Sequence, residues 1–128
     1  MERTHIRPNG GWEWLAWLYL RVSAALLLLL VLGHLYIMHV INTTDVIDFH
    51  FVAQRFRNPL WRAYDLLILV LALSHGLVGL RGIVHDYTRP GGGWRLAWNV
   101  VLWTVGLVFA LLGALVLFSF DPATFARP

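Results

Sequence analysis

The chain has 128 residues, which is the size of a single domain. Hydrophobic residues make up 59% of it and charged residues only 13%, about half the charged share of ordinary soluble domains, so a soluble fold of this size is excluded. The basic residues are ten scattered arginines that give a net charge of +3, which argues against nucleic acid as a partner and suits an anionic membrane surface, and the lack of cysteine excludes disulfides and thiolate chemistry.

Three apolar segments follow one another along the chain, and each is long enough to cross a bilayer as a helix, which takes about 20 residues. The first covers about residues 16–41, the second 60–84 and the third 96–120. Residues 42–59 form a polar connection, and residues 89–93 contain a proline and glycines that break a helix. The sequence therefore predicts an all-α integral membrane protein in which residues 1–128 form one domain of three transmembrane helices.

The ends of the spans predict how the chain inserts. Residues 1–14 lack the apolar stretch and cleavage site of a signal peptide, so we expect the first span to act as the insertion signal. Trp17, Tyr19, Trp61 and Tyr64 near the span ends are typical of interfacial anchors. The positive-inside rule slightly favours a cytoplasmic N-terminus, because one side holds five arginines and the other four: Arg3, Arg7, Arg81, Arg89 and Arg95 against Arg55, Arg57, Arg62 and Arg127.

His75 is the ionisable residue that lies deepest in a span. It falls about three residues, or ~4.5 Å, past the midpoint of the second span. Since ionisable groups are costly in hydrocarbon, we treat it as a functional candidate that needs a hydrogen-bond partner, a proton-relay role or a metal. Gly76, Gly79 and Gly82 leave room beside it for a bulky flat group, although glycines also permit close helix packing. We favour a haem iron, which commonly takes an axial histidine.

The other polar residues inside the spans have weaker functional arguments. His34 lies in the opposite half of the bilayer from His75, roughly 13 Å away in depth, so the two do not fit one iron. We expect His34 to be satisfied by a neighbouring group, with a haem propionate or a second haem as alternatives. Arg21, Asp65 and Arg81 lie near span ends, where pairing with lipid headgroups is as good an explanation as function.

A polar cluster, His85-Asp86-Tyr87, ends the second span. Asp86 follows His75 by eleven residues, so it lies on the same helix face roughly 16 Å further along. A phenol and a carboxylate at the membrane border can hydrogen-bond a quinone carbonyl and supply protons on its reduction. Both residue types are also common at helix ends, so the cluster alone does not establish a quinone site.

Together these residues resemble the D-type membrane-anchor subunit of bacterial succinate dehydrogenase, respiratory complex II. In that family the second span carries a His-Gly/Ala-x-x-Gly motif, which Asp-Tyr follows after ten intervening residues, and His75, Asp86 and Tyr87 match this spacing. The first span also fits through Arg21-Val22-Ser23 and Gly33-His34-Leu35.

The resemblance implies a set of partners and cofactors. The chain would pair with a second, C-type anchor in the bacterial cytoplasmic (inner) membrane and dock an iron–sulfur subunit and a flavoprotein, with trimers of the whole complex left open. Electrons from succinate would pass through FAD and iron–sulfur clusters, both in partner subunits, to ubiquinone or menaquinone. By position, His75 corresponds to the haem b ligand, Tyr87 to the tyrosine that bonds the quinone and Asp86 to its neighbouring acid. Arg21 and Ser23 would border the quinone pocket, and Arg81 would meet a propionate or the quinone.

Three other functions remain open at this point. The chain could anchor a fumarate reductase that runs the reaction backwards, bind haem outside complex II, or be a structural protein whose histidines neighbouring helices satisfy. With no flavin fingerprint, no cluster cysteines and no dicarboxylate pocket, we expect it to bind no succinate and to be inactive alone.

Overall fold

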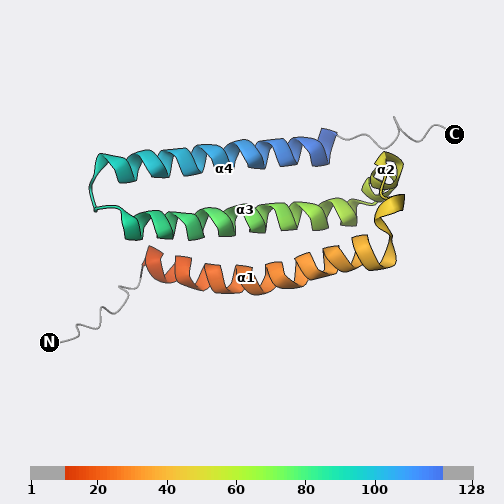
Figure 1. Cartoon of the computed structure of the whole chain (residues 1–128), viewed down its shortest axis with the longest axis horizontal. Coiled ribbons are helices and arrows are strands. Elements are labelled where there is room, and N and C mark those ends of the chain that lie inside the picture. Colours follow the sequence, from red (N-terminus) through yellow and green to blue (C-terminus); the bar gives the residue numbers. More distant parts are fainter. Residues whose placement is uncertain (1–10, 120–128) are drawn as a thin grey trace.

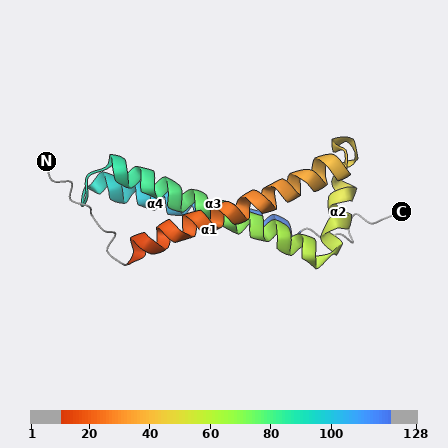
Figure 2. The same cartoon turned by 90° about the horizontal axis from the view of Figure 1, so that it is seen from below.

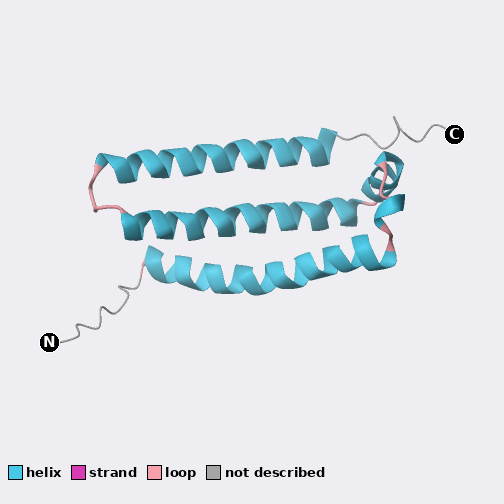
Figure 3. Cartoon of the chain, in the orientation of Figure 1, coloured by secondary structure: helices cyan, strands magenta, loops and turns pink. Residues whose placement is uncertain are grey.

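The computed structural model describes residues 11–119, and three long helices lying side by side dominate it (Figures 1 and 3). α1 spans Trp12–Tyr36, α3 spans Pro59–Tyr87 and α4 spans Gly93–Ser119. A short helix, α2, spans Phe49–Arg57, and no strand occurs in residues 11–119. Each of the three long helical segments is apolar and long enough to cross a membrane. The prediction of an all-α protein with three membrane-crossing helices is confirmed.

The long helices extend beyond the expected spans. α1 begins four residues before residue 16, α3 runs three residues past residue 84, and α4 begins three residues before residue 96. A helix satisfies its own backbone groups and therefore continues through the membrane interface until a stop signal ends it. Between α3 and α4 that signal is Gly91, whose φ of 74° is readily adopted only by glycine. Phe120 and three arginines used to assign orientation lie outside the described residues: Arg3, Arg7 and Arg127.

The connection between α1 and α3 is more ordered than its polar sequence led us to expect. A π-helical turn, Ile37–Ile41, prolongs α1, and a 3₁₀ turn, Thr44–Val46, precedes α2. Asp48 caps α2 by accepting a hydrogen bond from the backbone N–H of Phe51 at 2.8 Å. Ala53 and Phe56 of α2 are buried. The helix runs between the end of α1 and the start of α3 (Figure 2).

Two different packing geometries hold the long helices together. α4 runs alongside α3, whereas α1 crosses α3 at an angle, so that α1 and α3 diverge towards both ends (Figure 2). Ser23, near the middle of α1, is only 1% exposed, although most of the protein surface is open to lipid. The contact between α1 and α3 is therefore tightest in the middle of the membrane and leaves room at its two borders.

Glycines let α4 approach α3 closely. Gly106 and Gly113 are two turns apart on α4, and each faces a leucine of α3. A Cβ atom at Gly113 would lie 2.6 Å from Cδ2 of Leu69, and one at Gly106 would overlap the side chain of Leu77. Small residues at such positions allow the close van der Waals packing that drives helix association in lipid.

We expect Gly106→Val to destabilise the contact between α3 and α4 by about 1–3 kcal/mol, the usual cost of overpacking a well-packed site. The measurement is the midpoint of thermal unfolding of the purified protein in detergent. Ala97→Val adds similar bulk to an exposed position of α4 and is the control. Equal midpoints for the two variants would contradict the packing role of Gly106.

Candidate functional site

His75 is held by a hydrogen bond at the crossing of α1 and α3. Its Nδ1 lies 2.7 Å from Oγ of Ser23. The Ser23 hydroxyl donates to the carbonyl oxygen of Tyr19, one turn earlier in α1, at 2.6 Å. Because a hydroxyl has a single proton to donate, the Ser23 oxygen accepts from His75, and Nδ1 carries the hydrogen. In a neutral imidazole this direction of the bond corresponds to the Nδ1–H tautomer, which carries its lone pair on Nε2.

A second hydrogen bond joins the same two helices beside the first. The hydroxyl of Tyr19 bonds Oγ of Ser74, which itself donates to the carbonyl oxygen of Val70. Tyr19 and Ser23 are one turn apart on α1, and Ser74 and His75 are consecutive on α3. Both bonds join α1 to α3 at the crossing. Tyr19, which we expect to be an interfacial anchor, thus bonds α3 through its hydroxyl.

The three glycines near His75 are not needed for packing among the described helices. A Cβ atom at Gly76 or Gly82 would meet no atom within 4 Å, and one at Gly79 would only touch Leu20 at 4.0 Å. They differ in this from Gly106 and Gly113 of α4. The backbone of α3 is thus bare beside His75, which leaves a surface for a flat group or for a helix of another chain.

Asp86 and Tyr87 lie where α1 and α3 diverge. α3 is continuous through both residues, and the rise of a helix puts Tyr87 roughly 18 Å beyond His75. The side chain of Tyr87 is 89% exposed. It lines a recess of about 320 Å³ together with residues that follow it in the connection to α4: Thr88, Arg89, Gly92, Gly93, Trp94 and Arg95. The recess therefore lies at the end of α3, where the chain turns into α4.

Arg95 shapes the base of this recess. Its guanidinium donates to the carbonyl oxygen of His85 at 2.5 Å and to Oγ1 of Thr88 at 3.2 Å. These bonds satisfy groups at the C-terminus of α3, where the helix leaves its last carbonyls without internal partners. The imidazole of His85 is in turn 3.3 Å from the side-chain amide of Asn99 in α4. The end of α3 that carries Tyr87 is thereby fixed to α4.

The other candidates on this side do not gather around Tyr87. Ser23 is at the level of His75, and Arg21, two residues earlier, is exposed with its guanidinium 3.7 Å from the ring centroid of Trp17. Arg81 is half-buried and lies midway along α3 between His75 and Tyr87. The structure thus brings Ser23 together with His75 and leaves Arg21 away from the recess.

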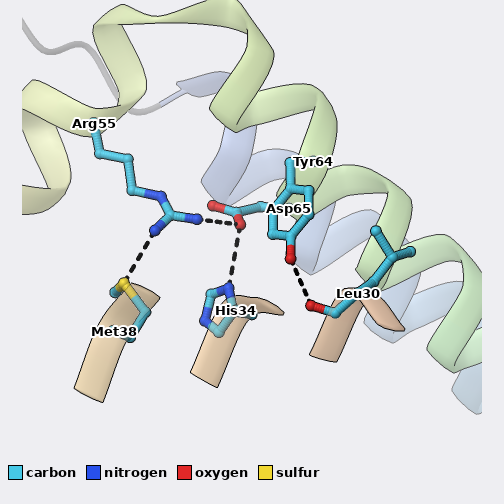
Figure 4. Close-up of polar contacts among 6 residues, drawn as sticks. All are labelled: Leu30, His34, Met38, Arg55, Tyr64 and Asp65. Atoms are coloured by element: carbon cyan, nitrogen blue, oxygen red, sulfur yellow. Dashed lines mark hydrogen bonds and ion pairs between the residues drawn. The ribbon is translucent and has the colours of Figure 1, made fainter. Parts of the chain in front are cut away.

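The opposite membrane border holds a partly buried polar cluster around the ion pair of Arg55 and Asp65 (Figure 4). Arg55 of α2 donates to Oδ1 of Asp65 in α3 at 2.9 Å, and the same oxygen lies 3.6 Å from Nδ1 of His34 in α1. The side chain of Arg55 is only 7% exposed. Its guanidinium also contacts Sδ of Met38 at 3.0 Å and lies 4.3 Å from the ring centroid of Trp61. One carboxylate therefore connects α1, α2 and α3.

Sequence reasoning missed this cluster. Asp65 was assigned to the membrane border and Arg55 to a polar connection, and only the unexpected helix α2 brings the two together. Tyr64 was expected to be an anchor, but its hydroxyl donates to the carbonyl oxygen of Leu30 at 2.5 Å and its ring stacks on His34. On α3, Asp65 precedes His75 by ten residues, about 15 Å. His34 and His75 therefore have separate partners at separate depths.

These features define a class of protein. It is a small multi-pass membrane protein that presents a fixed histidine near the middle of the membrane and a polar rim at one border. Residues 3–112 match the family model described as succinate dehydrogenase/fumarate reductase transmembrane subunit. The chain belongs to this family, as its His75, Asp86 and Tyr87 spacing predicted.

Two curated relatives carry the name succinate dehydrogenase hydrophobic membrane anchor subunit. The protein of Archaeoglobus fulgidus is 35% identical over 74 residues, which cover 58% of this chain and 62% of the relative. That of Thermoplasma acidophilum is 35% identical over 69 residues, which cover 53% of this chain and 56% of the relative. The matched segment thus spans less than two thirds of either relative. Both organisms are archaeal, whereas the sequence resemblance was to bacterial anchors.

We expect Arg55→Met to destabilise the protein by about 3 kcal/mol, because it leaves the carboxylate of Asp65 without its cation in a largely dry site. The double change Arg55→Met with Asp65→Leu is expected to recover much of this loss, since no lone charge then remains. Thermal unfolding in detergent measures both.

The matched control is Arg57→Met, which changes an exposed arginine of the same helix. Equal losses in Arg55→Met and Arg57→Met would show that the pair with Asp65 does not hold α2 in place.

Proposed function

We propose that this chain is the membrane-anchor subunit of a succinate:quinone oxidoreductase, that it binds haem b through His75, and that it borders a quinone site with Tyr87 and Asp86. Family membership and the names of the two relatives support the anchor role. The observation that carries the haem assignment is the 2.7 Å contact between Ser23 and His75, which leaves Nε2 as a free ligand atom in mid-membrane.

The residues around His75 fit an axial ligand of haem iron. Iron binds the neutral imidazole, and ligating histidines usually donate their other ring N–H to a neighbouring oxygen, as His75 donates to Ser23. Gly76 and Gly82 keep the adjacent surface of α3 bare. A haem bound here supplies one-electron chemistry inside the membrane. A second histidine for the haem would come from the second anchor subunit, because His34 lies too far along the bundle from His75 and faces Asp65.

Tyr87 and Asp86 serve the quinone in this proposal. The phenol of Tyr87, which lines the recess, donates a hydrogen bond to a quinone carbonyl, and the carboxyl of Asp86, the preceding residue, passes on the protons that reduction requires. The recess beside Tyr87, about 320 Å³, takes part of the headgroup. Since Tyr87 is 89% exposed here, the iron–sulfur subunit and the second anchor complete the pocket. The quinone is ubiquinone or menaquinone.

The remaining subunits carry out the chemistry on succinate. A flavoprotein with FAD oxidises it, and the clusters of the iron–sulfur subunit carry the electrons to the quinone, while this chain binds no succinate and anchors the assembly. The reduction potentials of the quinone and the clusters set the direction of the reaction, so a fumarate reductase uses the same anchor design.

We place the Tyr87 end and the N-terminus on the cytoplasmic side of a bacterial inner membrane. Four of the described arginines lie towards that end and three towards the other: Arg21, Arg81, Arg89 and Arg95 against Arg55, Arg57 and Arg62.

The first experiment compares reduced-minus-oxidised optical spectra of the purified wild-type complex and His75→Ala. We expect a b-type signal in the wild type and its loss in the variant, with the flavoprotein and iron–sulfur subunit still copurifying. His39→Ala, which changes an exposed histidine of the first span, is the control and is expected to keep the signal. A variant spectrum like that of the wild type would refute ligation by His75.

A second experiment concerns Tyr87→Phe. Removing one hydrogen bond to the quinone is worth about 1 kcal/mol, so we expect quinone reduction to fall by several-fold up to about tenfold. Succinate oxidation with a soluble dye, which bypasses the membrane site, is expected to stay at the wild-type rate. Equal losses in the two assays would point to defective assembly and contradict the role of Tyr87 at the quinone.

A further inference from the structure

We propose that Ser23 is a positioning residue for the iron ligand: it holds His75 as the Nδ1–H tautomer and directs Nε2 away from α1. This inference rests on the proposed binding of haem by His75. It gives a residue of α1, Ser23, the role of orienting the ligand on α3. The role differs from the one that sequence position gave Ser23, which was to border the quinone.

The number of hydroxyl protons fixes which group donates in the bond between Ser23 and His75. Ser23 and Ser74 each donate their hydroxyl proton to the carbonyl oxygen one turn earlier in their own helix, Tyr19 and Val70 respectively. Each serine oxygen can then only accept across the crossing, Ser23 from the imidazole of His75 and Ser74 from the phenol of Tyr19. The same arrangement occurs twice, so the helix backbone itself turns both serines into acceptors.

Burial gives this bond its importance. Ser23 is 1% exposed, so no water competes for its oxygen. Without that oxygen, the Nδ1–H of His75 would lose its acceptor in a setting of hydrocarbon, which is costly for a polar group. The imidazole would then rotate or change tautomer, and either change moves the lone pair of Nε2 away from the iron.

The bond also adjusts the ligand electronically. When Nδ1–H donates to an oxygen, the imidazole becomes more basic, and a more basic ligand favours the ferric over the ferrous haem. The loss of the Ser23 oxygen is therefore expected to raise the reduction potential of the haem and to weaken its retention. Neither effect requires a change in the fold, because serine and alanine are nearly the same size.

The experiment compares the complete complex carrying wild-type chain, Ser23→Ala or Ser74→Ala, with subunit content checked in each. Ser74→Ala is the matched control, since it removes the neighbouring bond to Tyr19 and leaves the imidazole of His75 untouched. The measurements are the potentiometric midpoint of the haem, the low-spin ferric signals in electron paramagnetic resonance, and the rate of haem transfer to excess apomyoglobin.

For Ser23→Ala we expect a more positive midpoint, shifted ferric signals and haem loss about tenfold faster, the lower end of the affinity lost when such a supporting residue is removed. Ser74→Ala is expected to match the wild type in all three. Wild-type behaviour of Ser23→Ala, or equal changes in both variants, would overturn the positioning role while His75 remains the ligand. A haem signal that survives His75→Ala would instead overturn the proposed function itself.

Discussion

The crossing of α1 over α3, where Ser23 bonds His75, is the constraint on which the rest of the molecule depends. Helices in lipid gain little by burying apolar side chains against one another, because the surrounding chains of lipid are equally apolar. The relative position of the helices must therefore come from polar contacts and from close approach of their backbones. Two hydrogen bonds through serine hydroxyls position α1 on α3, and the close approach at Gly106 and Gly113 positions α4 on α3. The result is a rigid centre in which a histidine has a defined orientation.

The same crossing explains why polar residues collect at the two membrane borders. Helices that meet at an angle diverge away from the contact, and the space between them must be filled or left open. At one border the chain fills it with α2, whose Arg55 reaches Asp65. At the other border α1 diverges from α3, and no helix corresponding to α2 fills the space within residues 11–119. The recess that we assign to quinone is at this border too, where Tyr87 at the end of α3 meets the connection to α4.

Features that depend on one helix alone could be predicted from the sequence. The three spans follow from the length of the apolar segments, and His75 stands out because a titratable group in mid-membrane is costly unless it has a partner or a function. The partners of such residues depend on how helices are aligned with one another, which periodicity along one chain does not encode. The bond of Ser23 to His75 therefore could not be foreseen. Asp65 and Arg55 are recognisable as opposite charges, yet their pairing requires α2, whose short amphipathic pattern lies within a stretch rich in polar residues.

The cluster at Asp65 has a consequence for the order in which the protein is built. All of its members belong to the first two spans and the connection between them, so it can close before α4 has entered the bilayer. A hairpin of α1 and α3 that is already joined at Asp65 leaves Gly76 and Gly82 of α3 uncovered in the other half of the membrane. The contacts of α1, α2 and α3 at Asp65 can thus form first, and the close packing of α4 on α3 through Gly106 and Gly113 can follow.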